Sequence, residues 1–172
     1  MLNHARPSGD STAPVGTIPI VRNSVTVHMK AKPEEIWALV SDVTNTRRFA
    51  AETFDARWLD GATGPAVGVR FKGHVKRNGW GPVYWSVATI DACDPGREFA
   101  FSVDLAPGRP AIRWRYEFEP NGDGTDVTES FELRNDWYLR LYWLLLGWAR
   151  GKTNVENMRT TLERIKAAVE AG

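Results

Sequence analysis

The sequence predicts an α+β domain in which one strand and two short helices precede six further strands and a C-terminal helix. Residues 24–31 alternate apolar and polar side chains, as a half-buried strand does. Residues 53–134 form strand-like runs separated by turns rich in Gly and Pro. Residues 155–169 place apolar side chains three and four positions apart, which is the spacing of one helical face.

Two short helices are predicted directly after the first strand. Pro33 suits the first position of a helix, and Glu34 and Glu35 suit its positive end. Apolar residues within 36–40 supply the buried side of this helix. A second helical piece is predicted over residues 44–50, so the two helices form a short connector.

Six strand-like runs follow, each ended by a turn of Gly, Pro, Asn or Asp. They cover residues 53–60, 68–77, 83–93, 97–105, 111–119 and 125–134. Successive side chains of a strand point to opposite faces, so the alternation predicts which side chains point inward. The set predicted to point inward on two of these strands is Val69, Phe71, Gly73, Val75, Ile112, Trp114, Tyr116 and Phe118. The set predicted to face solvent alternates with it and consists of Arg70, Lys72, His74, Lys76, Arg113, Arg115, Glu117 and Glu119.

The last third of the chain is helical in pattern. Its apolar stripe consists of Val155, Met158, Leu162, Ile165 and Val169. Residues 136–146 have a helical pattern as well, and Gly147 and Gly151 are predicted to break or kink the helix between the two pieces.

The segment 137–148 is apolar nearly all round. It is either buried against the mouth of the sheet, a lid over a cavity, a dimer interface or a helix on a membrane surface. Burial or a homodimer is favoured over membrane contact, because few cations flank the segment. A membrane span is excluded, since its most apolar part, residues 141–149, would be only about 14 Å long as a helix.

Composition narrows the class of protein. The chain has 172 residues, of which 42% are hydrophobic and 25% charged, as in an ordinary globular domain. A formal net charge of +1 argues against nucleic-acid binding. The single cysteine, Cys93, closes no intrachain disulfide and fits a reducing, cytoplasmic compartment. Residues 1–22 are predicted to be a flexible leader without a secretory signal, which leaves residues 23–172 as one domain.

Several motifs resemble those of a known superfamily. They are the first strand, the PEEIWALVSD run at 33–42, GPAVGVRF at 64–71, the 87–101 segment with its Asp-Pro turn, GTDVTE at 124–129 and TLERIK at 161–166. Across residues 24–170 the chain resembles the START/Bet v1-like (SRPBCC) superfamily, in particular its polyketide cyclase/dehydrase and lipid-transport group. The resemblance implies a helix-grip fold, in which a seven-stranded antiparallel sheet wraps around the C-terminal helix and encloses a cavity. Members include ligand carriers and aromatases/cyclases, so the fold alone does not choose a function.

The inward-pointing side chains are the candidate ligand-binding residues. They are Phe71, Val87, Phe99, Phe101, Trp114, Tyr116, Glu129, Phe131, Met158 and Leu162. The alternative is a dry, filled core, because core packing favours the same residue types.

Two polar side chains of this set are the candidate catalytic residues. Glu129 is in phase with Val127 and Phe131, so its carboxylate should point inward and have a raised pKa. Such a group would orient a ligand or move a proton, unless it occupies a solvated rim or a bulge. The Tyr116 phenol would donate to a ligand carbonyl, and Arg47 is a candidate cation at the entrance.

The remaining reactive residue types do not form a catalytic or metal motif. His28 and His74 occupy the polar phase of their strands, and Cys93 is predicted to be a small buried residue. No metal site and no cofactor is expected.

Three functions remain open at this stage. The first is binding of a hydrophobic or aromatic small molecule, lipid-like or polyketide-like, in an internal cavity. The second is a polyketide cyclase/dehydratase-type enzyme, and the third is a non-catalytic interaction protein that uses segment 137–148.

Overall fold

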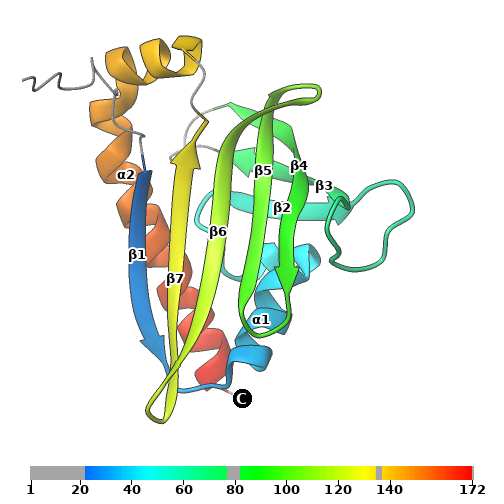
Figure 1. Ribbon diagram of the computed structural model, residues 1–172, viewed down its shortest axis with the longest axis vertical. Helices are drawn as coiled ribbons and strands as arrows, with labels where there is room; N and C mark the ends of the chain where they lie inside the picture. Colours follow the sequence, from blue (N-terminus) through cyan, green and yellow to red (C-terminus); the bar gives the residue numbers. More distant parts are fainter. Residues whose placement is uncertain (1–21, 77–81, 135–136, 172) are drawn as a thin grey trace, which may run out of the picture.

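All seven strands belong to one antiparallel sheet, and a long C-terminal helix lies across one side of it (Figure 1). The computed structural model describes residues 22–76, 82–134 and 137–171, with the backbone alone described over 137–153. The elements in chain order are β1 (Arg22–Met29), α1 (Pro33–Ser41), the 3-10 helix η1 (Val43–Arg48), β2 (Thr53–Trp58), β3 (Arg70–Lys76), β4 (Val83–Asp94), β5 (Glu98–Ala106), β6 (Arg109–Asn121), β7 (Gly124–Leu133) and α2 (Trp137–Glu170). The strand order is β1-β7-β6-β5-β4-β3-β2. The predicted α+β helix-grip class, with two short helices after the first strand, is confirmed.

The first strand begins slightly earlier than predicted. Arg22 and Asn23 pair with Glu132 and Phe131 of β7, so β1 starts inside the predicted leader. The rest of that leader, residues 1–21, lies outside the described residues.

The two short helices are positioned by local hydrogen bonds. Pro33 opens α1, and the Glu35 carboxylate accepts a hydrogen bond from the Lys32 backbone N–H. The Asp42 carboxylate accepts from the Thr44 N–H at 3.1 Å and thereby caps η1. Trp37 Nε1 donates to the Glu98 carbonyl at 3.1 Å, which fastens α1 to β5.

The C-terminal helix is kinked and not broken, so of the two predicted alternatives the kink is met and the break is wrong. Helix α2 is one element over Trp137–Glu170, and Figure 1 shows its first part turned away from the axis of the rest. Glycine costs a helix about 1 kcal/mol but retains the backbone N–H, so two glycines do not interrupt the hydrogen-bond ladder. The side chains of segment 137–148 are outside the described part, and its predicted roles stay predictions. Among the described helices, none has the length and apolar character needed to cross a membrane.

Strand pairing aligns the inward side chains in rows across the sheet. The Glu129 row runs across five strands and consists of Val25, Glu129, Tyr116, Phe99 and Cys93. The Trp114 row lies nearer the start of α2 and consists of Phe131, Trp114, Phe101 and Ile90. The Ile112 row is nearer still and consists of Leu133, Ile112, Val103, Ala88, Phe71 and Trp58.

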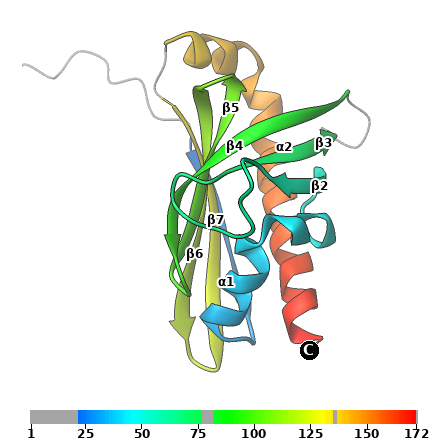
Figure 2. The same ribbon diagram turned by 90° about the vertical axis from the view of Figure 1, so that its right-hand side faces the viewer.

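Both helices lie on the same side of the sheet and cover different strands (Figure 2). Helix α2 packs mainly on β1 and β7, whereas α1 packs on β5 and β6. The stripe residues Met158, Leu162 and Ile165 are fully buried in the same core as the sheet. The core therefore sits between the inner face of the sheet and the last turns of α2.

The tight approach of the β6–β7 turn to β1 yields a first prediction. A Cβ added at Gly124 would collide with the Met29 carbonyl oxygen, whereas a Cβ at Gly64 would meet no atom. We expect Gly124→Ala to lower the unfolding free energy by about 2 kcal/mol, because the backbone at Met29 or at Gly124 would have to move to relieve the collision. Gly64→Ala serves as the control and should change it little. Urea denaturation of both variants measures the difference, and equal stabilities would contradict the packing at this turn.

Candidate functional site

The inner face of the sheet is lined by rings that contact one another. Phe71 lies between Trp58 and Phe101, with ring centroids 6.1 and 5.2 Å away. Trp114 and Phe131, on neighbouring strands, have ring centroids 5.5 Å apart. These side chains come from five strands, and the antiparallel register places them on the same face of the sheet.

Most of the predicted lining residues do face the interior. The buried ones are Phe71, Phe99, Tyr116, Glu129, Phe131, Met158 and Leu162. Phe101 and Trp114 also face inward but are only half-buried. Their role in binding a ligand stays a proposal.

Val87 is the exception, and its predicted inward orientation is wrong. In β4 it pairs with Lys72, while its neighbour Ala88 pairs with the buried Phe71. Residues paired across strands share a face, so Val87 lies on the outer face of the sheet. Within residues 83–90, both the inward and the outward positions carry apolar side chains. Alternation alone therefore assigned Val87 to the wrong face of the sheet.

The inner face is not covered evenly. In the central strands β5 and β6, Phe99 and Tyr116 of the Glu129 row are buried. Toward the start of α2, the inward side chains of the same two strands become half-buried; they are Phe101, Val103, Ile112 and Trp114. Because α2 packs mainly on β1 and β7, this part of the inner face is the least covered by the side chains that the structure describes. Sequence reasoning predicted that Ile112 points inward but did not include it or Trp58 among the ligand-binding candidates, since only the register shows which residues share a row.

A buried acid and a buried phenol meet in the Glu129 row. The Tyr116 hydroxyl donates a hydrogen bond to Glu129 Oε1 at 2.8 Å. The Glu129 side chain is 4% exposed, and its second oxygen, Oε2, is excluded from solvent and has no hydrogen-bond partner among the described side chains. The prediction that Glu129 points inward is confirmed, and the alternatives of a solvated rim or a bulge are wrong.

Burial sets the protonation of this pair. It raises the pKa of Glu129 from its ordinary 4.5 to about 8, although the hydrogen bond from Tyr116 acts in the opposite direction. Burial, followed by the Glu129 charge and the hydrogen bond, also raises the pKa of the Tyr116 phenol. Glu129 is therefore mainly a neutral acid near pH 7. It can accept at one oxygen and donate or accept at the other, and a ligand hydroxyl or carbonyl would satisfy the free position.

The other candidate residues lie away from this pair. His28 Nδ1 is 2.8 Å from Asp126 Oδ1 at the end of β1, and His74 stacks on Trp85 on the outer face. Arg47 is exposed in η1. Cys93 is half-buried at the end of the Glu129 row, so the prediction that it is buried is only partly met. Within residues 22–76, 82–134 and 137–171, no group of three His, Cys, Asp or Glu is placed to hold a metal ion.

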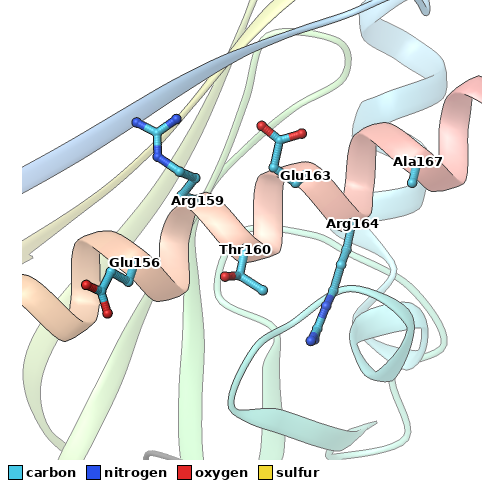
Figure 3. Close-up of a pocket in the computed structure, with 6 residues that line it drawn as sticks. All are labelled: Glu156, Arg159, Thr160, Glu163, Arg164 and Ala167. Carbon is cyan, nitrogen blue, oxygen red and sulfur yellow. The ribbon is translucent and has the colours of Figure 1, made fainter.

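Hollows on the outside of the molecule include two that are lined by described side chains. One lies along the solvent side of α2, where Glu156, Arg159 and Glu163 project from the helix (Figure 3). The other lies between residues 30–35 and 122–124. Neither is lined by the predicted ligand-binding residues, so neither is the expected internal cavity.

Comparison with known proteins identifies the family. A model of the family described as polyketide cyclase / dehydrase and lipid transport matches residues 21–170. The chain belongs to this family. The match spans every strand and α2 to its last residue, which confirms the resemblance to START/Bet v1-like proteins. No curated protein matches the sequence.

Solved structures of members and relatives have the same fold. The polyketide_cyc-like protein Cgl2372 from Corynebacterium glutamicum is 23% identical over 89% of each chain, with a TM-score of 0.51. Ara h 8.0201 is 12% identical over 90% of this chain and 100% of that chain, with a TM-score of 0.65. The di-domain ARO/CYC protein StfQ from the steffimycin biosynthetic pathway is 11% identical over 88% of this chain and 51% of that chain, with a TM-score of 0.68. At these identities the likeness establishes the helix-grip fold.

Proposed function

We propose that the chain binds an apolar or aromatic small molecule, lipid-like or polyketide-like, between the inner face of the sheet and α2. The observation that carries the proposal is the unpaired Oε2 of Glu129 on an otherwise apolar face. A buried polar atom without a partner costs about 1–3 kcal/mol. A ligand that brings one hydroxyl or carbonyl to this oxygen would recover that energy.

The half-buried rings supply the apolar part of the proposed site. Phe101, Ile112 and Trp114 face inward and are only half-buried, and we take this part of the sheet as the entrance for the ligand. Phe131 lies two residues along β7 from Glu129, between this entrance and the acid. A ligand therefore has to displace apolar side chains to reach Oε2.

Family membership supports the same class of ligand. The family description includes lipid transport, and StfQ is named as an ARO/CYC protein of a biosynthetic pathway. Ligands of both kinds are largely apolar with a few oxygens, which matches an aromatic face carrying one acid and one phenol.

Two probes of equal shape test the proposal. We expect 2-naphthol to bind about tenfold more tightly than 2-methylnaphthalene, because only the hydroxyl can pair with Glu129. In the double variant Tyr116→Phe, Glu129→Leu this preference should disappear, while binding of 2-methylnaphthalene persists. Isothermal titration calorimetry measures all four affinities.

The matched control is Glu132→Leu, at an exposed position of the same strand, which should retain the preference. Absence of binding by both probes would contradict an interior site. Binding with an unchanged preference in the double variant would contradict the role of the acid.

An enzyme of the cyclase/dehydratase type is the second candidate, and the Tyr116–Glu129 pair is the observation that favours it. A neutral carboxylic acid next to a phenol can protonate a carbonyl oxygen of a reactive chain. Native mass spectrometry of the protein isolated from its own host separates the two functions. A carrier retains a ligand that it returns unchanged, whereas a cyclase converts the chain that it is given.

The proposal includes a cellular compartment for the protein. The free thiol of Cys93 suits a reducing, cytoplasmic compartment. A homodimer, or a non-catalytic interaction through segment 137–148, stays a prediction from the sequence.

A further inference from the structure

The outer face of the sheet is divided into two chemically different halves. Arginines of β6 lie within ion-pair distance of carboxylates on β5 and β4. Arg115 Nε lies 2.7 Å from Glu98 Oε1, and Arg113 Nε lies 3.5 Å from Asp91 Oδ2. This half is a charge-balanced surface facing water, as the sequence predicts.

The other half, over β2–β4, is basic. The outward positions of β3 are all cationic or imidazole groups, namely Arg70, Lys72, His74 and Lys76. Arg70 is paired with Asp60, and Arg57 of β2 is paired with Asp55. Over the described residues, no carboxylate lies within ion-pair distance of Lys72 or Lys76.

Large apolar side chains are exposed on the same half. Phe54 is 46% exposed, Val83 48% and Trp85 41%. Trp85 stacks on His74 with ring centroids 4.3 Å apart. The Phe54 ring also contacts His74, with ring centroids 4.4 Å apart. We call this set, together with Arg57, Lys72 and Lys76, the outer aromatic patch.

Cations and rings are in direct contact within the patch. Lys72 Nζ lies 4.6 Å from the Trp85 ring centroid, and the Arg57 guanidinium carbon lies 5.7 Å from it. Exposing an aromatic ring to solvent is less unfavourable when cations and another ring contact it. The arrangement therefore holds Trp85 at the surface with positive charge beside it.

This combination matches one kind of partner better than others. Tryptophan favours the boundary between lipid headgroups and acyl chains, and cations next to it attract anionic headgroups. A nucleic acid would need an open ring face for base stacking, but the Trp85 ring is already stacked on His74. The exposed aliphatic side chain of Val83 adds apolar surface. Such surface is favourable at the boundary between headgroups and acyl chains but not against the phosphate backbone of a nucleic acid.

We propose that the outer aromatic patch docks the protein on an anionic membrane surface. Phe54, Val83 and Trp85 enter the headgroup region, while Lys72 and Lys76 face lipid phosphates. The proposal does not depend on what the interior binds, because the patch is on the opposite face of the sheet.

Co-sedimentation with vesicles tests it. The full chain should bind vesicles of phosphatidylcholine with phosphatidylserine and leave vesicles of phosphatidylcholine alone largely unbound. Lys72→Gln and Lys76→Gln should each weaken binding about fivefold. Trp85→Ser should weaken it about tenfold through lost apolar contact.

Matched controls lie elsewhere on the surface. Lys30→Gln removes an exposed cation at the opposite edge of the sheet, and Leu105→Ser removes an apolar side chain that is 64% exposed. Both should bind anionic vesicles as the unmodified protein does. Equal binding to both vesicle types, or unaltered binding by Trp85→Ser and the lysine variants, would overturn the proposal. So would light scattering that shows a dimer converted to a monomer by Trp85→Ser, because the patch would then join two copies of the chain.

Discussion

Between about pH 5 and pH 8, the unmodified protein should lose stability relative to Glu129→Gln, by roughly 1 kcal/mol per pH unit. The folded-state pKa of Glu129 is about 8, whereas the unfolded chain has the ordinary value of 4.5. In this interval the unfolded state has released a proton that the folded state still holds, so raising the pH favours unfolding. The stabilisation by the neutral acid is complete below pH 4.5 and is lost as the pH approaches 8.

Urea denaturation at several pH values measures this effect. Glutamine keeps an oxygen that accepts from Tyr116 and carries no titrating proton, so the difference between the two proteins isolates Glu129. The side chains paired with Glu129 across the sheet are Tyr116 and the apolar Val25. His28 is present in both proteins, so its titration cancels in the difference. Glu132→Gln is the control at an exposed position. Parallel stability curves for the unmodified protein and Glu129→Gln would show that the acid is not buried as described.

Replacing Phe131 with alanine should lower the unfolding free energy by about 3–5 kcal/mol. The ring is 1% exposed, contacts Trp114 and lies directly beside Glu129 along β7. Its removal leaves an apolar void in the part of the core that the proposed ligand must enter. Such a void stays dry and binds small aromatic molecules.

A second measurement separates loss of packing from misfolding. Added toluene should raise the unfolding temperature of Phe131→Ala more than that of the unmodified protein, because it binds only the folded state. Glu132→Ala, next along the strand and exposed, should differ little from the unmodified protein. A cost below about 1 kcal/mol would mean that the inner face is not packed at Phe131.

Alternation predicted much of the inner face, and its failures have physical causes. On β3 and over residues 112–119 of β6, polar and apolar residues alternate, so the orientation of Phe71 and Tyr116 follows from the sequence. On β4 both phases are apolar, and the assignment of Val87 was wrong. The position of Glu129 was predictable for the same reason as that of Tyr116.

The contact between Tyr116 and Glu129 was not predictable from alternation. Tyr116 and Glu129 are paired because the β6–β7 turn at residues 122–123 sets the register of the hairpin. The uneven cover of the inner face depends on where α2 packs, which is a tertiary property. Free volume in an apolar core has no sequence signal, since the same residues fill or line it.

The most direct test follows the Glu129 carboxyl carbon by NMR during a pH titration, with and without 2-naphthol. Our account predicts a titration near pH 8 in the free protein, and a shift of both the resonance and its midpoint when 2-naphthol is present. Glu132, exposed on the same strand, should not respond to the probe. A titration near 4.5 that is the same with and without 2-naphthol would contradict a buried neutral acid that meets a ligand in the interior.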